Sequence, residues 1–211
     1  MKKSSERMLV VAATLVALAA GAGAYAWSGW YDIGADAPHW KSTYALLTLL
    51  RDRSIQVRAQ NLAPPNLDDP QLILKGAGQY AAMCTGCHLA SGMRDSEIRP
   101  GLYPQPPDLA RLRIDPRGAF WVIKHGIKMS AMPAWGSSHD DATIWSMVAF
   151  LRKLRGMTPT EYKAIVARAP PDDDMAMDDQ PGHAGTGMGG MPMPAGATTS
   201  AASAGTPQPA Q

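Results

Sequence analysis

Both cysteines of this 211-residue chain lie in one five-residue segment, Cys84-Thr85-Gly86-Cys87-His88. Two cysteines are too few for a scaffold that is held by several disulfides. A structural zinc site needs four ligands, and the chain has no second cysteine pair to supply them. A thioredoxin-like redox pair needs a βαβ context, and we find no convincing strand. A single disulfide would leave the neighbouring histidine unexplained, so the pattern indicates chemistry that uses both thiols and the imidazole.

The spacing C-x-x-C-H is the attachment sequence for c-type haem. Two thiols add to the two vinyl groups of the haem, and the next residue presents its imidazole to the iron. Cys84 and Cys87 are therefore predicted to hold one covalent haem c, with His88 as an axial ligand of the iron. This cofactor uses both cysteines, which would otherwise be reactive or bridged in an oxidising compartment.

The N-terminal segment, residues 1–31, is predicted to be a signal-anchor helix that crosses a membrane. An uncharged run over residues 8–31 follows three basic residues. About 20 apolar residues span a bilayer, whereas the apolar region of a cleaved signal peptide has about 7–15. The basic end stays in the cytoplasm by the positive-inside rule, so the body lies on the periplasmic side of a bacterial inner membrane. A signal peptide that is cleaved after Ala24 or Ala26 is the alternative, and it would release the body into the periplasm. Aromatic residues typical of a membrane interface close the run: Trp27, Trp30 and Tyr31.

The C-terminal segment, residues 170–211, is predicted to be a disordered tail. It has no Lys or Arg, and it contains seven Pro, seven Gly and eight Ala. Such a segment buries too little apolar surface to offset the entropy lost on ordering. Thioether and imidazole groups suit Cu(I), so weak copper binding is the alternative to a plain flexible tail. No ligand spacing repeats, which favours the plain tail. The groups concerned are Met175, Met177, Met188, Met191, Met193 and His183.

The body between these ends is predicted to be all-α with loops. Residues 32–67 form a connector whose helix, over 38–60, could lie near the membrane surface or pack on the domain. Residues 68–169 form the haem domain, which ends in a short helix. Caps and apolar periodicity place the helices of this domain. We expect them to begin at Asp69-Pro70, Asp115-Pro116, Ser138 and the capping box Thr158 to Glu161, and to bury Ile144, Met147, Val148, Leu151 and Leu154 of the long C-terminal helix.

The domain resembles class I cytochrome c over about residues 68–156, which is 89 of the 211 residues. The resemblance rests on C-x-x-C-H and on three features around it. Two residues precede the motif in four-residue steps, a proline pair follows it, and a Met-Pro segment lies further on. These features are Gly76 and Tyr80, then Pro106-Pro107-Asp108-Leu109, and then Met129-Ser130-Ala131-Met132-Pro133-Ala134-Trp135-Gly136.

This resemblance implies how the first and last helices of the domain pack together. Gly76 would let the two backbones approach closely, and the ring of Tyr80 would fill the crossing beside the haem. Their partners on the last helix would lie among Trp145, Val148 and Leu151.

The same resemblance implies the surroundings of the haem. The Pro107 carbonyl would accept a hydrogen bond from Nδ1–H of His88, and such a bond fixes the ring orientation and tunes the iron. Leu109 would pack on the haem, and Trp135 would belong to the haem environment.

Met132 is the candidate for the sixth iron ligand, because in this family the Met immediately before Pro in the distal loop binds iron. Met/His ligation is typical of electron-transfer proteins, and the thioether raises the reduction potential. Three nearby residues are the alternatives to Met132. We expect Met129 to be packing, His125 to end a helix and Lys128 to be solvated. His39, His139 and His183 have no motif and are expected to be surface groups.

Charge restricts the partners of the chain. The formal net charge is only +2, which argues against a nucleic-acid-binding protein. Residues 68–156 contain eight acidic and eleven basic residues, a net charge of +3. This excess suits docking on an acidic redox partner, although an ordinary solvated surface would look the same. The candidates for pairing with the haem propionates are Arg99, Arg111 and Arg113.

The resemblance and the motifs together predict a periplasmic electron carrier that is anchored in the inner membrane and is not itself an enzyme. It would pass single electrons between a donor and an acceptor protein. Three alternatives stay open. The chain could be a haem-containing subunit of a larger oxidoreductase, a haem-based gas sensor in which Met132 dissociates, or a copper-handling protein that acts through its tail.

Overall fold

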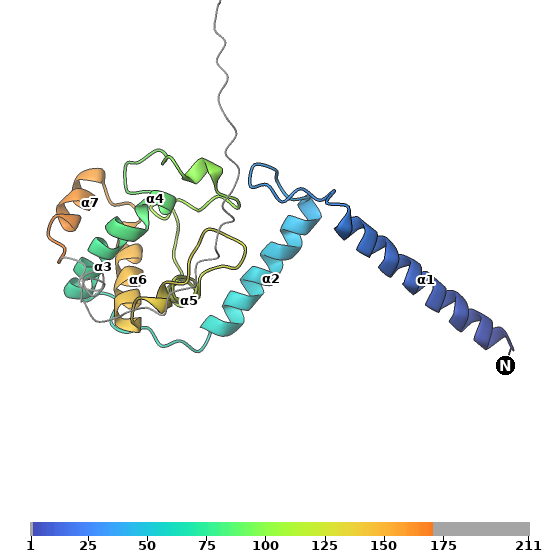
Figure 1. Ribbon diagram of the computed structural model, residues 1–211. Coiled ribbons are helices and arrows are strands. Elements are labelled where there is room, and N and C mark those ends of the chain that lie inside the picture. The colour runs from blue at the N-terminus through green and yellow to red at the C-terminus, as the bar shows by residue number, and fades with distance from the viewer. Residues whose placement is uncertain (1, 171–211) are drawn as a thin grey trace, which may run out of the picture. The chain divides into compact units, whose positions relative to one another are not determined.

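The computed structural model describes residues 2–170, and all regular secondary structure in this part of the chain is helical (Figure 1). This confirms the all-α prediction. The predicted tail from residue 171 onward, with its methionines and His183, lies outside the described residues. The α-helices are α1 (Lys2–Trp27), α2 (Lys41–Ala59), α3 (Pro70–Met83), α4 (Thr85–His88), α5 (Pro116–His125), α6 (Asp141–Leu154) and α7 (Pro159–Val166), and two 3-10 turns are η1 (Arg99–Gly101) and η2 (Trp135–Ser137).

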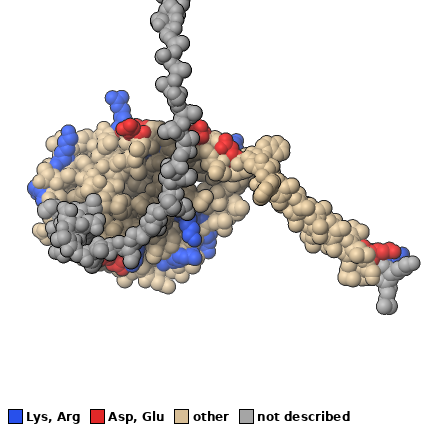
Figure 2. Space-filling model, in the orientation of Figure 1, with Lys and Arg blue, Asp and Glu red and all other residues tan. Residues whose placement is uncertain are grey.

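Helix α1 is long and apolar enough to cross a membrane over Lys3–Trp27. None of this stretch is buried against the rest of the described protein, so its apolar side chains do not belong to the core. Its charged atoms are gathered near its N-terminal end, as Figure 2 shows. These properties fit a membrane anchor, and a signal sequence would share them.

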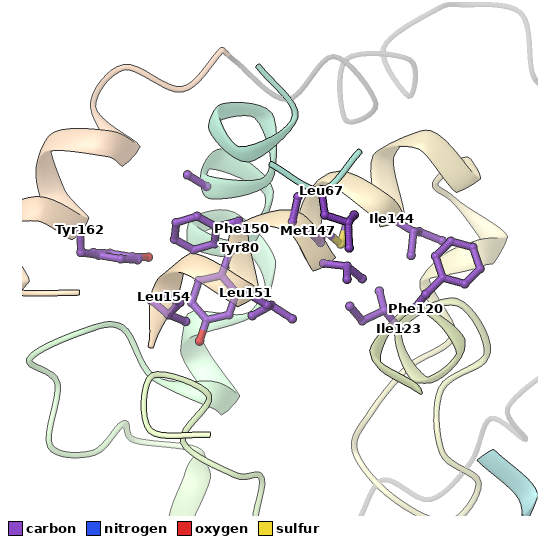
Figure 3. Packing of buried hydrophobic residues seen from close by; sticks show 13 residues of the cluster. Leu67, Tyr80, Phe120, Ile123, Ile144, Met147, Phe150, Leu151, Leu154 and Tyr162 are labelled. Atoms are coloured by element: carbon purple, nitrogen blue, oxygen red, sulfur yellow. The ribbon is translucent and has the colours of Figure 1, made fainter. Parts of the chain in front are cut away.

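The core of the domain forms where α3 crosses α6 (Figure 3). Gly76 lies at the crossing, where a Cβ atom would stand 1.9 Å from the carbonyl oxygen of Ser146. Tyr80 is fully buried, and its ring centroid lies 5.5 Å from that of Phe150. The predicted apolar face of α6 is buried as expected. It comprises Ile144, Met147, Val148, Leu151 and Leu154.

Of the three residues predicted as partners of Gly76 and Tyr80, Val148 and Leu151 are buried in the same cluster as Tyr80, but Trp145 faces α5 instead. Trp145 is only partly buried and stacks on Phe120, with 4.1 Å between ring centroids. The α3 backbone instead approaches α6 at Ser146, which is fully buried although it is polar. Apolar periodicity did not reveal this position because the contact is made between backbones, and a small residue permits it whatever its polarity.

Helix caps explain most of the boundaries. The N-caps Asp69 and Asp115 and the capping box of Thr158 with Glu161 confirm the predicted starts of α3, α5 and α7. Two predicted starts are wrong. Helix α2 begins at Lys41 rather than Pro38, and α6 begins at Asp141 rather than Ser138. The reason at α6 is that Asp140 Oδ1 accepts a 2.7 Å hydrogen bond from the backbone N–H of Thr143, and η2 occupies the preceding residues.

The cap of α6 should make the domain sensitive to acid. The hydrogen bonds from Thr143 hold the pKa of Asp140 below its ordinary value of 3.8. A lowered pKa in the folded state contributes stability above pH 3.8, and this contribution is lost as the pH falls through the folded pKa. We expect Asp140→Asn to keep the cap at neutral pH and to weaken the loss of stability below about pH 4. Urea unfolding from pH 7 to pH 3 measures this.

Asp140→Ala separates the charge of this residue from its capping role. Alanine cannot accept the hydrogen bond, so it should cost about 1 kcal/mol at neutral pH, where Asp140→Asn costs little. Equal losses for the two variants at pH 7 would contradict the proposed cap.

Helix α2 packs on the domain near α5. Ile55 Cγ2 would lie 3.6 Å from a Cβ atom at Gly118, and the Arg117 guanidinium donates a 3.2 Å hydrogen bond to the Gln60 carbonyl. At the other end of α2, the backbone N–H of His39 donates to the hydroxyl of Tyr103. The predicted connector therefore contacts the domain through the segments before and after α2 as well as through the helix.

Candidate haem site

The five-residue motif continues directly from the core helix α3. Cys84 caps α3, and the one-turn helix α4 carries the rest of the motif. The backbone N–H of His88 donates a 2.8 Å hydrogen bond to the Cys84 carbonyl, so the turn holds both thiols and the imidazole close together. Both thiols are free, and burial together with the neighbouring Cys87 raises the pKa of Cys84 to about 12.

The imidazole of His88 is oriented by a residue far along the chain. Its Nδ1 lies 2.9 Å from the carbonyl oxygen of Pro107. Because a carbonyl only accepts hydrogen bonds, Nδ1 must carry the proton, and the lone pair is then on Nε2. Burial lowers the pKa of His88, with Arg99 adding to this and the Pro107 carbonyl opposing it. The neutral ring that results is the form that binds metals.

Met132 stands at the end of a tight turn that follows α5. Gly126 begins the turn with φ of +64°, and a Cβ atom there would lie 2.7 Å from the Met132 carbonyl oxygen. That oxygen accepts a 3.1 Å hydrogen bond from the N–H of Ile127. The Met132 N–H donates to the hydroxyl of Ser130, which donates in turn to the Ile127 carbonyl. The Met132 side chain is partly buried against the core cluster.

Met129 lies three residues earlier in the same loop and differs from Met132 in its exposure. Its side chain is 98% exposed, and its backbone has φ of +58°. The expectation that Met129 is a packing residue is therefore wrong. The exposure of Met129 favours Met132, which packs against the core, as the candidate thioether ligand.

The donor groups of the site fit a c-type haem. Two thiols, a neutral imidazole with a fixed proton and a partly buried thioether form the set that covalent attachment and His/Met ligation require. Among the described residues there is no cluster of three or more His, Cys, Asp or Glu that could hold a metal ion.

A comparison with known protein families identifies the family of this domain. A family model described as cytochrome C oxidase, cbb3-type, subunit III matches residues 71–151. This part of the chain is a cytochrome c family domain. Such a domain implies haem binding and haem-based electron transfer. No curated protein and no solved structure matches the chain.

Within the cytochrome c domain, Tyr80 has a contact that the sequence did not indicate. Its hydroxyl donates a 2.6 Å hydrogen bond to the Leu89 carbonyl and lies 3.3 Å from the His88 carbonyl. Leu89 is buried with φ of +65°, so the backbone turns sharply just after the iron-ligand candidate. Burial raises the pKa of Tyr80 and keeps this hydroxyl protonated as a donor. Phenylalanine would fill the crossing equally well, so the choice of tyrosine at position 80 is the feature of the sequence that indicates a hydrogen bond from this hydroxyl.

Tyr80→Phe should destabilise the cytochrome c domain by about 1–3 kcal/mol, because it leaves the buried Leu89 carbonyl without its donor. The matched control is Tyr162→Phe. The Tyr162 ring is also buried, but its hydroxyl has no hydrogen-bond partner within residues 2–170. Removing that hydroxyl should leave the free energy of unfolding unchanged or raise it slightly. Guanidinium unfolding of the two variants measures the difference, and equal effects would contradict a bracing role for Tyr80.

The remaining predicted residues of the cytochrome c domain are placed as follows. Leu109 and Trp135 are half-buried against the core, and the Leu109 N–H donates a 3.3 Å hydrogen bond to the His88 carbonyl. Arg99 is the most buried of the three propionate candidates, and its Nε donates to the Pro106 carbonyl at 3.1 Å. Arg111 pairs with Asp108 but is largely exposed, and Arg113 is exposed.

The prediction of a surface histidine is wrong for His139. His139 is only 6% exposed and lies beside Trp135, with 5.6 Å between ring centroids. His39 is half-buried between Tyr31 and Tyr103. Tyr103 contacts His39 from a segment distant in the sequence, whereas the ring beside His139 belongs to Trp135, four residues earlier. His125 does end α5, as predicted, and Lys128 is exposed.

Proposed function

We propose that the chain is a membrane-anchored electron-transfer protein that carries one covalent haem c on the periplasmic side of a bacterial inner membrane. Cys84 and Cys87 form the thioether links, and His88 and Met132 are the axial ligands of the iron. The observation that carries this proposal is the 2.9 Å contact between His88 Nδ1 and the Pro107 carbonyl within a cytochrome c domain. It prepares the imidazole for the iron through a residue that lies outside the motif.

The protein's own residues are arranged for electron transfer rather than for ligand exchange. When bound, the haem supplies a reversible one-electron centre. Pro107 holds one axial ligand, while the turn from Gly126 to Met132 holds the other through the hydrogen bonds of Ser130. With both positions occupied by protein side chains, small molecules have no open coordination site. This arrangement favours the carrier over the gas sensor.

The membrane location rests on α1. Its basic N-terminal end predicts that the cytochrome c domain lies outside the cytoplasm. Covalent attachment of haem would use the two cysteines there, which an oxidising compartment would otherwise leave reactive or bridged. The anchor would hold the domain close to redox partners in the same membrane and so raise their effective concentration. Cleavage of the segment would leave a periplasmic carrier with the same chemistry.

The chain could act as a free carrier or as a subunit of an oxidase complex. The matching family is described as an oxidase subunit, and this favours the second role. Both roles need a protein donor and a protein acceptor, and the net charge of +3 on residues 68–156 suits an acidic docking surface. The alternative of copper handling depends on residues beyond the described range.

Purification from native membranes tests this proposal. We expect a haem that acid acetone does not extract, a sulfur-to-iron charge-transfer band in the oxidised protein, and little carbon monoxide binding by the reduced protein. Absence of the band together with ready carbon monoxide binding would contradict the carrier and favour the sensor. Co-purification with stoichiometric oxidase subunits would establish the subunit role, whereas isolation as a single polypeptide would favour the free carrier.

A further inference from the structure

Helix α2 exposes an apolar face to solvent within the described part of the chain. Leu46, Leu49, Leu50 and Val57 are 56%, 58%, 57% and 50% exposed, respectively. At about 100° per residue these four side chains fall within a sector of about 100° around the helix, which we call the outer face of α2. Clusters of this kind on a protein surface mark contact with a membrane or with another protein.

The opposite side of α2 faces the cytochrome c domain, so the outer face is not a misplaced part of the core. Ile55 contacts the domain near Gly118, and Ala59 is only 3% exposed. The contact with α5 thus fixes the rotation of α2 about its own axis. The outer face is left for a partner that lies outside the described residues.

The charge of α2 suits an anionic lipid surface. The helix contains four basic residues and one acidic residue, which gives a net charge of +3. Arg53 lies in the sector of the outer face, where its long side chain can lay its methylene groups along lipid and keep its charge at the headgroups. Helices that lie in a membrane interface combine an apolar face with basic residues in this way.

The chain also places α2 close to the end of the proposed membrane span. Tyr31 hydrogen-bonds with His39 at 2.7 Å, and the His39 ring lies 5.2 Å from the ring of Tyr103 in the domain. Only residues 28–30 separate Tyr31 from Trp27, the last residue of α1. Four residue steps extend at most about 14 Å, so the start of α2 cannot lie far from the bilayer surface. Trp30 and Trp40 are also exposed here, as interfacial aromatic residues would be.

We infer that α2 lies in the headgroup region of the membrane that α1 crosses, with its outer face toward lipid. This inference rests on the proposed membrane anchor. The short link between the span and the domain favours lipid over a protein partner, because it brings the outer face to the bilayer whether or not a partner is present. The outer face extends from Leu46 to Val57, so the axis of α2 must lie roughly parallel to the bilayer for all of it to reach lipid. The cytochrome c domain would then present a fixed side to the membrane rather than swing on a loose connector.

A matched pair of labels on the full-length holoprotein tests this inference. We propose Leu50→Cys on the outer face and Asp52→Cys two residues later, about 200° further round the helix. Each variant would carry an environment-sensitive fluorophore, since the haem already occupies both native cysteines. The protein would be reconstituted into phosphatidylcholine–phosphatidylglycerol vesicles with and without nitroxide-labelled lipid. For each variant, the ratio of the emission with nitroxide lipid to the emission without it cancels the energy transfer to the haem. The haem absorbance spectrum reports whether each variant is folded.

We expect nitroxide lipid to reduce the emission at position 50 roughly twofold or more, because interfacial helices sink about 5–10 Å into the boundary between headgroups and acyl chains. Emission at position 52 should change little. If the protein floats with the vesicles but neither label is quenched, the inference is wrong while the anchor stands. If the protein does not float, the anchor fails and the inference fails with it. If the fluorophore at position 50 moves to an apolar environment only when native membrane proteins are added, the outer face binds a protein partner. That result would also overturn the inference.

Discussion

Met132→Ala should abolish the sulfur-to-iron charge-transfer band of the oxidised protein, and the reduced protein should then bind carbon monoxide readily. The reduction potential should fall by roughly 0.1–0.3 V, which lies within the range of about 0.8 V that axial ligands span. The physical reason is that a thioether stabilises the reduced iron, and alanine offers no ligand in its place. Visible spectra, a redox titration and carbon monoxide difference spectra measure the three effects.

Met129→Ala is the matched control, because Met129 lies three residues earlier in the same loop and is 98% exposed. This variant should retain the charge-transfer band and a potential close to that of the unaltered protein. Loss of the band in Met129→Ala but not in Met132→Ala would exchange the assigned roles of the two methionines. An unchanged band in both variants would show that the sixth ligand is another group.

Gly76→Ala should destabilise the cytochrome c domain by about 3 kcal/mol or more. The added Cβ atom would stand 1.9 Å from the carbonyl oxygen of Ser146 and 2.4 Å from its carbonyl carbon. These are backbone atoms within a helix, so no side-chain rotation can relieve the clash, and α3 must move away from α6. The yield of holoprotein should fall as well, because α3 leads directly into the motif that begins at Cys84. Chemical unfolding and the ratio of haem to protein measure the two losses.

Gly78→Ala is the control in the same helix. Its Cβ atom would meet the Ala169 Cβ at 3.0 Å and the Pro170 carbonyl oxygen at 3.3 Å, next to the end of α7. A small shift of that segment relieves the contact, and alanine favours a helix over glycine by about 1 kcal/mol. The free energy of unfolding should therefore change by less than about 1 kcal/mol. A loss as large as that of Gly76→Ala would show that any side chain in this part of α3 is destabilising and that the crossing is not special.

The features that could be predicted from the sequence depend on residues close together in the chain. The N-caps Asp69 and Asp115 and the box of Thr158 with Glu161 accept hydrogen bonds from backbone donors within three residues. The motif from Cys84 to His88 needs only one helical turn to bring its groups together. Local chemistry of this kind does not depend on how the rest of the chain folds.

Some of the errors come from contacts with segments that are distant in the sequence. A proline suits a first helical turn, so Pro38 predicts a start of α2 that is too early, because His39 is held by Tyr31 and Tyr103 instead. His139, by contrast, is buried beside Trp135 only four residues earlier, so the error at His139 concerns a local contact. The crossing of α3 on α6 lies at Ser146 because backbone approach requires a small residue and not an apolar one.

The sequence by itself determined the kind of cofactor, the all-α class and the apolar N-terminal segment, because covalent spacing, helix caps and runs of apolar residues are properties of short stretches. Only the tertiary structure decided the partners of each side chain. It placed the Tyr80 hydroxyl on Leu89 and the inner side of α2 on α5. The contact of the Pro107 carbonyl with His88, by contrast, was already implied by the resemblance to class I cytochrome c. The contacts of Tyr80 and α2 join residues that the chain brings together only when the core has formed, so no local pattern specifies them.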